Sequence, residues 1–282
     1  MAQPNRSGVD KDRLVNLALH RQHRSVFEGG TMTVDNEGHR RRRAPAVGGS
    51  RGPKYVPPES VEQRSISDLL GIGGRNTLAP KQMDFLSGAA NLFCAGDISL
   101  LSNRCIAVIG ARKASDLGRR RARQLGRQLA AAGVVVVSGL AEGIDTEALT
   151  GAIEAGGSVV AVIGTPLDQA YPAKNKALQE AIYRDHLLIS QFHPGTRVFP
   201  SNFPARNRTM AALSDASVVI EASDTSGTLH QAAECQRLGR WLVIAKSVVE
   251  NEDLTWPEKF VGQPRTLILE STQSLLDEIY PS

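Results

Sequence analysis

The chain has 282 residues, of which 41% are hydrophobic and 22% charged. These values are typical of globular proteins and allow one sizeable core with appendages. No apolar run approaches the roughly 18 residues of a transmembrane helix, and the N-terminus lacks the apolar segment of a secretory signal. The formal net charge is +4, but residues 1–54 carry 11 Lys and Arg against 5 Asp and Glu, whereas the remainder carries 22 against 24. The surplus of positive charge therefore belongs to an N-terminal arm.

The three cysteines are Cys94, Cys105 and Cys235. Their odd number and wide spacing match neither a disulfide framework nor a zinc site. Cys105 and Cys235 stand in apolar or helical contexts and are predicted to be buried. The six histidines show no ligand spacing. We therefore expect a reducing, cytoplasmic setting, with no metal and no cofactor.

Residues 1–58 are predicted to form a disordered basic arm, which ends at Pro57–Pro58. The segment is rich in Arg, Gly, Pro and Ser, and Arg40–Arg43 is a run of four arginines. Two interpretations remain open at this point. The arm is either a solvated tail or a segment that holds nucleic acid electrostatically.

Residues 59–104 are predicted to form a short helical lead-in that packs on the main domain. Helices are expected at Ser65–Leu70 and at Pro80–Ala90, because glycines follow the first and Asn91 follows the second. A segment of about 45 residues is too small for a core of its own. We therefore assign it to the domain that follows.

Residues 105–282 are predicted to form an α/β domain with a Rossmann-like, open and mostly parallel sheet, covered by helices on both faces. Apolar, β-branched runs alternate with amphipathic helical stretches, which is typical of such sheets. The first three runs are Cys105–Ile109, Val134–Val137 and Ser158–Ile163. Each ends in a small residue at its carboxyl end, the edge where open α/β sheets bind ligands.

The remaining elements of this domain follow from the same patterns. The first helix is expected to be capped by Ser115 or Asp116, with Leu117, Leu125 and Leu129 facing the sheet. Further strands are expected at Leu187–Ser190, Ser217–Ile220, Trp241–Ile244 and Thr266–Leu269. Further helices are expected up to Ala155, at Asn175–Arg184, up to Leu213, from Thr228 to Leu238 and at Gln273–Ile279.

Three loops between a strand and a helix share an anion-binding character. Glycine lets the backbone approach an anion closely, and the following helix N-terminus offers free N–H groups. Arginine adds a planar donor fork suited to phosphate. Each glycine alone is equally consistent with a tight turn, but three such loops on one rim predict a phosphate or nucleotide groove. The loops are Gly110-Ala111-Arg112-Lys113, Ser138-Gly139 and Ser226-Gly227-Thr228.

A fourth element is Arg206-Asn207-Arg208, which follows Phe203-Pro204. We expect this segment to lie in a loop, with Phe203-Pro204 as a rigid extended dipeptide. Two arginines around an asparagine are suited to successive phosphates or a base edge. The alternative is a pair of arginines in surface salt bridges.

These motifs resemble the DprA/Smf DNA-processing proteins in order and spacing over about residues 90–250. The series reads IAVIGARKAS, VVVVSGLAEGID, AVIGTPLDQAYP, LISQFHPG, FPARNRTMAALSDASVVIEA and SGTLHQAAE. The resemblance implies a Rossmann-like domain that binds single-stranded DNA, acts in natural transformation and helps to load a RecA-type recombinase. We also expect a homodimer. By resemblance, the DNA-phosphate groove would comprise Arg112, Ser138, Gly139, Arg206, Arg208 and Ser226–Thr228, with Lys174 as a further basic contact.

The chain departs from the family pattern at several positions. Leu149 follows Ala148 where the family has histidine, Gln191 follows Ser190 where it has glutamate, and Lys246–Ser247 replaces Pro-Gly. These departures indicate a divergent or specialised member of the family.

The same fold superfamily includes nucleotide-cleaving phosphoribohydrolases of the LOG type, which carry GG-x-GT-x-x-E. Gly227–Thr228 matches that motif, but Gln231 stands where those enzymes place the catalytic glutamate. An amide cannot act as a general base. Glu234, one helical turn further on, is either a substitute or a solvated helix residue, and Asp145 is expected to brace the second loop.

The sequence therefore predicts a non-enzymatic single-stranded DNA-binding protein. The alternative is a nucleotide-binding sensor or a LOG-like phosphoribohydrolase on the same rim. The eight basic residues between Arg104 and Arg127, which are accompanied by one acid, favour the first interpretation.

Overall fold

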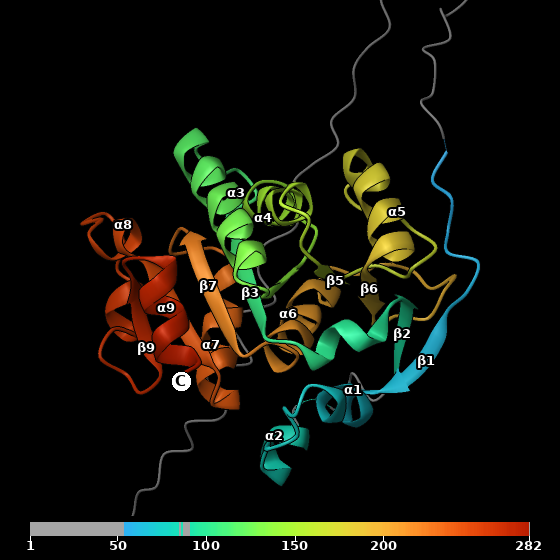
Figure 1. Cartoon of the computed structure of the whole chain (residues 1–282), viewed down its shortest axis with the longest axis horizontal. Helices are drawn as coiled ribbons and strands as arrows, with labels where there is room; N and C mark the ends of the chain where they lie inside the picture. The colour runs from blue at the N-terminus through green and yellow to red at the C-terminus, as the bar shows by residue number, and fades with distance from the viewer. Residues whose placement is uncertain (1–53, 85, 87–90, 282) are drawn as a thin grey trace, which may run out of the picture. The chain divides into compact units, whose positions relative to one another are not determined.

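The computed structural model describes residues 54–84, 86 and 91–281. Most of the predicted basic arm therefore lies outside the described residues. Within them, nine strands form one sheet in the order β1-β2-β6-β5-β4-β3-β7-β8-β9 (Figure 1). The strands are β1 (Glu62–Ser65), β2 (Asn91–Gly96), β3 (Cys105–Gly110), β4 (Val135–Ser138), β5 (Val159–Ile163), β6 (Leu187–Ser190), β7 (Ala216–Glu221), β8 (Trp241–Ala245) and β9 (Thr266–Leu269).

All neighbouring strands from β6 to β9 are parallel, whereas β2 pairs antiparallel with both β1 and β6. Helices follow most of the parallel strands along the chain, as the sequence predicts. The helices are α1 (Ile66–Ile72), α2 (Pro80–Asp84), α3 (Asp116–Ala131), α4 (Ile144–Glu154), α5 (Lys176–Asp185), α6 (Asn202–Ala212), α7 (Thr228–Leu238), α8 (Lys246–Val249) and α9 (Thr272–Ile279), with short 3-10 turns at η3 (Ile98–Ser102), η4 (Ala173–Asn175) and η5 (Pro257–Lys259).

The side chains of each strand alternate between two buried layers, one on each face of the sheet, since successive residues point to opposite faces. Cys105, Ala107 and Ile109 of β3 join a cluster that includes buried residues of α1, α6 and α7. Ile106 and Val108 join a second cluster with residues of α3, α4, α5 and α9. The predicted α/β fold with a mostly parallel sheet covered on both faces is therefore confirmed, as is the burial of Cys105 and Cys235. Among the described helices, none has the length and apolar character needed to cross a bilayer.

Helix α3 follows its predicted course, with one difference. Ser115 caps it by accepting a hydrogen bond from the Gly118 N–H at 3.0 Å, and Leu125 and Leu129 are buried. Leu117, however, is 48% exposed, contrary to the prediction. It precedes Leu125 by eight residues, which is a rotation of about 80° beyond two full turns at 3.6 residues per turn. That rotation moves its side chain off the buried face.

The lead-in is more than helical, because it adds two strands to the sheet. Helix α1 is present and begins with a capping box between Ser65 and Asp68, but β1 and β2 were not predicted. α2 (Pro80–Asp84) confirms the start of the predicted helix at Pro80–Ala90, whose remainder lies, apart from Leu86, outside the described residues. The strand β2 was missed because its partner, β6, lies far along the chain and no local pattern shows that pairing. Residues 51–282 form one compact unit, so the lead-in belongs to the same unit as the sheet.

The described chain is already anchored ahead of Pro57–Pro58. The Tyr55 hydroxyl donates to the Leu167 carbonyl at 2.8 Å, and burial raises the pKa of Tyr55 to about 12. The Val56 N–H donates to a carboxylate oxygen of Glu180 at 2.9 Å. Tyr55 and Val56, which the sequence assigns to the arm, therefore already contact the folded domain, at Leu167 and at Glu180 of α5.

A buried ion pair ties the lead-in to the core. Arg75 is 3% exposed, and its Nε and Nη2 donate to the two carboxylate oxygens of Asp215, each at 2.8 Å. Asp215 also accepts from the Cys105 N–H at 2.9 Å and the Tyr280 hydroxyl at 2.7 Å. One carboxylate thus connects the loop after α1, the first residue of β3 and the end of α9. Burial, with Asp215 close by, raises the pKa of Tyr280.

We expect Arg75→Met to lower the free energy of unfolding by about 3 kcal/mol or more, because it leaves Asp215 without its buried cation. Arg64→Met is the control, since Arg64 pairs with Glu62 on the surface, where both side chains are about half exposed. Urea denaturation measures both variants. Equal losses in the two variants would contradict the anchoring role of Arg75.

Candidate functional site

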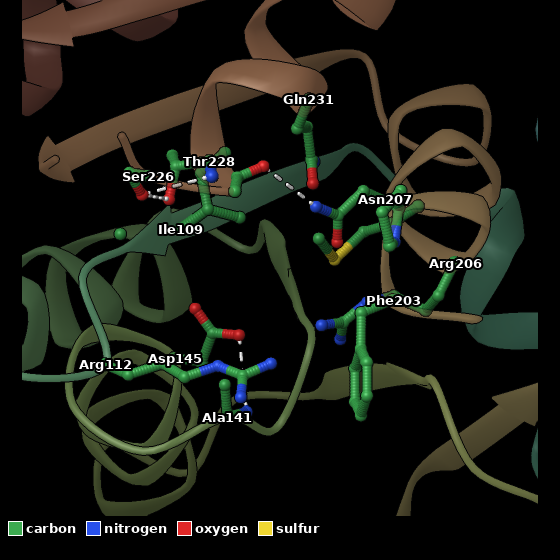
Figure 2. Close-up of a pocket in the computed structure, with 14 residues that line it drawn as sticks. Ile109, Arg112, Ala141, Asp145, Phe203, Arg206, Asn207, Ser226, Thr228 and Gln231 are labelled. Atoms are coloured by element: carbon green, nitrogen blue, oxygen red, sulfur yellow. Dashed lines mark hydrogen bonds between the residues drawn. The ribbon is translucent and has the colours of Figure 1, made fainter. Parts of the chain in front are cut away.

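A cavity of about 170 Å³, called here the central cavity, lies at the carboxyl edge of the sheet (Figure 2). It adjoins the end of β3, whose neighbours β4 and β7 continue the chain in opposite directions across the sheet. Such a reversal of strand order opens a crevice where α/β proteins bind ligands. Seven of the twelve predicted phosphate-binding residues line this cavity: Gly110, Arg112, Arg206, Asn207, Ser226, Gly227 and Thr228.

Arg112 is the exposed cation of this cavity. Its guanidinium carbon lies 5.0 Å from the centre of the Phe203 ring, a cation–π contact that fixes the direction of the side chain. Arg112 also lines the two cavities that adjoin the central one. Lys113, the next residue, is exposed and lines both of these neighbours. The first glycine-rich loop therefore presents two cations to the open edge of the sheet.

The third loop also faces the central cavity, as predicted. Ser226 Oγ accepts a hydrogen bond from the Thr228 N–H at 3.1 Å and donates to Thr228 Oγ1 at 2.9 Å. Gly227 is exposed, and a Cβ atom added there would meet nothing within 4 Å. The Asn207 amide donates to the Gly227 carbonyl at 3.3 Å, which ties α6 to the start of α7. The N-terminus of α7 is thus exposed at the cavity, with the Thr228 N–H already bonded to Ser226.

Arg206 does not lie in an exposed loop. Residues 203–208 belong to α6, because proline is tolerated in the first turn of a helix, where no carbonyl awaits its missing N–H. Arg206 is 5% exposed, and its Nη1 donates to the Val162 carbonyl at 2.7 Å and to the Gly139 carbonyl. Burial lowers the pKa of Arg206 to about 10, so the side chain remains a cation at neutral pH.

The second loop is held from inside the protein. The Ser138 hydroxyl is fully buried and donates to the Val108 carbonyl at 2.7 Å. Buried Asp145 accepts from the Gly139 N–H at 3.2 Å and the Ala141 N–H at 3.3 Å, which confirms that it braces the loop. A Cβ atom at Gly139 would overlap the Arg206 guanidinium. The predicted phosphate donors Ser138 and Gly139 therefore bond to the protein itself and shape the wall of the cavity.

Burial raises the pKa of Asp145, an effect that the Arg206 charge and the two loop N–H groups oppose. Electrostatic attraction between the buried Asp145 carboxyl and the buried Arg206 guanidinium thus favours the charged form of each, at either side of the second loop. Both line the central cavity, as Figure 2 shows. Of the two cations that line the cavity, Arg112 is exposed and Arg206 is buried.

The remaining predicted cations carry ion pairs. Arg208 lies 3.5 Å from Glu234, which also pairs with Arg237 at 2.8 Å. Lys174 pairs with Glu142 at 2.8 Å, and both side chains are about half exposed. Neither Arg208 nor Lys174 lines the central cavity. The structure therefore places both of them beside the cavity, each with a carboxylate partner.

The positions that would matter for nucleotide cleavage are also visible. Gln231 lines the central cavity with its side chain fully buried, and its amide donates to the Ser217 hydroxyl at 3.0 Å. Glu234 does not line the cavity, and its carboxylate faces two arginines. Among the described lining residues, the one carboxylate is that of Asp145. No group of three metal-ligating side chains occurs in the described part of the chain.

One feature of the site was not predicted from the sequence. Tyr171 and Phe203 pack ring on ring, with centroids 5.6 Å apart, and Tyr171 is 49% exposed. Gly164 allows this packing, since a Cβ atom there would lie 2.7 Å from the Phe203 ring. The two aromatic residues stand far apart in the chain, and no local signal places them together. The two rings are tilted by 48° to each other, and the exposed Tyr171 ring lies against the ring that Arg112 contacts.

The model of the DNA recombination-mediator protein A family matches residues 79–279. The chain belongs to this family. It is 42% identical over 149 residues to the DNA processing protein DprA of Streptococcus pneumoniae, an alignment that covers 53% of the chain and 52% of the relative. It is 34% identical over 191 residues to the DprA of Bacillus subtilis, covering 67% and 64%. The chain thus spans between about half and two thirds of these relatives.

Solved structures of the family have the same fold. The structure of DprA from Streptococcus pneumoniae superposes with a TM-score of 0.65 at 32% identity, over 78% of this chain and 75% of the other. DprA from Helicobacter pylori superposes with a TM-score of 0.61 at 27% identity, over 71% and 92%, and its structure is described as giving insights into single-stranded DNA binding. The predicted DprA/Smf membership and Rossmann-like fold are confirmed.

A double-mutant cycle tests the support of the second loop. Gly139→Ala and Arg206→Ala should each lower the free energy of unfolding by about 3 kcal/mol, because each leaves buried groups without partners. The double variant should lose much less than the sum, because both changes break the same contacts. Gly227→Ala is the control and should have a small effect, since its Cβ atom enters open space. Additive losses in thermal or urea unfolding would show that the two residues act independently.

Proposed function

We propose that this protein binds single-stranded DNA without catalysing a reaction, and holds its phosphates along the carboxyl edge of the sheet. The single observation that carries the proposal is the position of Arg112. This exposed guanidinium, fixed on Phe203, lines the central cavity and both adjoining cavities at the reversal of strand order. Membership in the recombination-mediator family and the described DNA binding of the Helicobacter pylori relative support it.

The residues divide into contacts and supports. Gly110, Arg112 and Lys113 of the first loop and residues 226–228 of the third would meet the phosphates, with Asn207 beside them. Ser138, Gly139 and Arg206 would act indirectly by fixing the cavity wall. Lys174 and Arg208 would add weaker contacts, because their carboxylate partners compete with phosphate.

Aromatic residues are scarce in the chain, which favours binding led by phosphate contacts with little dependence on sequence. The exposed ring of Tyr171 adds one stacking surface beside Arg112. The remaining steps that the family suggests are proposals of the same kind: a cytoplasmic role in natural transformation, loading of a RecA-type recombinase and a homodimer.

The second candidate is a nucleotide sensor or LOG-like phosphoribohydrolase. Gln231 argues against cleavage, because a buried amide stands in the cavity where those enzymes need a carboxylate. The test is incubation of the protein with nucleoside monophosphates. Release of ribose 5-phosphate by the wild type, lost in a Glu234→Gln variant, would replace the non-enzymatic proposal.

Arg112→Ala should weaken binding of single-stranded DNA by about 1–3 kcal/mol through loss of a charge-assisted phosphate contact. Its unfolding free energy should stay unchanged, because the side chain is exposed. Arg197→Ala is a matched control: Arg197 also lies over an aromatic ring, that of Phe199 at 5.5 Å, but lines none of the three cavities. Fluorescence anisotropy measures the affinities. Equal affinity of the wild type and Arg112→Ala would remove this edge as the DNA site.

Single strands should bind about tenfold or more tightly than a duplex of equal length, because a rim of loops follows a flexible backbone and offers no helix to the major groove. Binding should also weaken steeply with salt. A competition titration at fixed salt compares the two forms of DNA. Equal affinity for duplex would show that general electrostatic attraction, not this rim, controls binding.

A further inference from the structure

A second basic cleft, called here the α3–α9 cleft, has no role in the proposal above. Its volume is about 600 Å³, and it is bounded by α3, the start of α9 and the carboxyl ends of β8 and β9. Arg120, Arg121 and Lys246 line it, against one acidic residue, Glu270. The hydroxyl of Thr272 donates to the Gln128 side chain at 2.7 Å, which joins the two helices at the cleft.

Helix α3 carries arginines of two kinds. On the side toward α4, Arg123 pairs with Glu147 at 2.7 Å and with Glu154, and Arg127 pairs with Glu154 at 2.7 Å. These two charges are neutralised within the protein. The pairing also lowers the pKa of Glu154.

On the side toward the cleft, α3 carries charge that carboxylates do not neutralise. Arg120 and Arg121 are exposed, and within the described part of the chain neither has an ion pair. Arg121 donates instead to the Ser247 hydroxyl at 2.7 Å, which holds its guanidinium at the edge of the cleft. Two adjacent, uncompensated guanidinium groups are suited to an anionic ligand with repeated charges.

An intermediate cleft of about 510 Å³ joins the two sites. It shares Arg112 and Ser226 with the central cavity, and Arg121 and Ser247 with the α3–α9 cleft. Cations and hydroxyl groups therefore line the way from the ring of Phe203 to the start of α9, interrupted by the Glu221 carboxylate, which accepts hydrogen bonds from the Ser115 N–H and hydroxyl. Such a row of donors along an open groove is what binding of a polynucleotide backbone requires.

We propose that the single strand leaves the central cavity through the intermediate cleft and ends in the α3–α9 cleft, where Arg120 and Arg121 bind its phosphates. The proposal rests on the proposed function and adds a direction to it: the DNA runs toward α9. The continuity of the clefts and the unpaired charge on one side of α3 favour DNA over an acidic protein segment, which would not need the link to the central cavity.

The test compares two oligothymidylates with the full chain, one of about 4 and one of about 16 nucleotides, which span the site sizes of known single-strand-binding folds. The short strand fills the central cavity, and the long strand reaches the α3–α9 cleft. In Arg120→Ala/Arg121→Ala, affinity for the long strand should fall about tenfold or more and the salt slope should flatten by about 1.4, since each phosphate contact contributes about 0.7. Affinity for the short strand should stay at the wild-type value.

Arg123→Ala/Arg127→Ala is the matched control, because it removes the same charge from the same helix on the side that faces α4. It should keep the wild-type preference for the long strand, and urea unfolding checks that both double variants are folded. Wild-type affinity of Arg120→Ala/Arg121→Ala for the long strand would overturn the proposed path, as would equal losses in the two double variants or an equal loss for both strands.

Arg112→Ala separates this proposal from the proposed function. If Arg112→Ala weakens binding of both oligonucleotides while Arg120→Ala/Arg121→Ala weakens neither, the central cavity remains the proposed DNA site and the path toward α9 is wrong. If Arg112→Ala binds both strands as the wild type does, the proposed function itself fails. Wild-type DNA binding by Arg120→Ala/Arg121→Ala, together with loss of binding to polyglutamate, would assign the cleft to an acidic protein partner and overturn the path.

Discussion

The buried guanidinium of Arg206 is the interaction on which the site depends. It enters the space that Gly139 leaves by having no side chain, bonds to carbonyls after β4 and on β5, and faces the carboxylate of Asp145. A cation so deeply buried is tolerated only where charge and hydrogen bonds compensate it. The strand ends, the second loop and α6 are therefore fixed together, and the open edge beside Arg112 takes its shape from them.

The sequence predicted the sheet well because its signals are local. The apolar runs at Cys105–Ile109 and Thr266–Leu269 are bounded by polar and glycine residues, and each proved to be a strand close to the predicted limits. The strand Asn91–Gly96 was not predicted, because its antiparallel partner β6 is remote in the chain. The same difference between local and long-range signals applies to the site. The loops that hold Arg112 and Ser226 were placed correctly, since a strand followed by glycine predicts them.

The roles of the arginines were the least predictable part. The sequence assigns both Arg112 and Arg206 to the phosphate groove, yet one is exposed and the other buried. Arg206 is buried because it fills the space beside Gly139, a residue far away in the chain. It also lies in α6, which begins at Asn202 and includes Pro204 in its first turn. The same holds along α3, where residues a few positions apart differ because carboxylates of α4 reach only one side.

The contrast between Gly139 and Gly227 bears on how this groove can diversify. The Arg206 guanidinium occupies the space where a side chain at Gly139 would lie. A substitution at Gly139 would therefore destabilise the fold, and selection for folding would remove it whatever its effect on binding. Gly227 faces open space at the mouth of the same cavity, so side chains of many kinds fit there without loss of stability. A substitution at Gly227 would therefore alter the mouth of the cavity, while one at Gly139 would disturb the wall behind it.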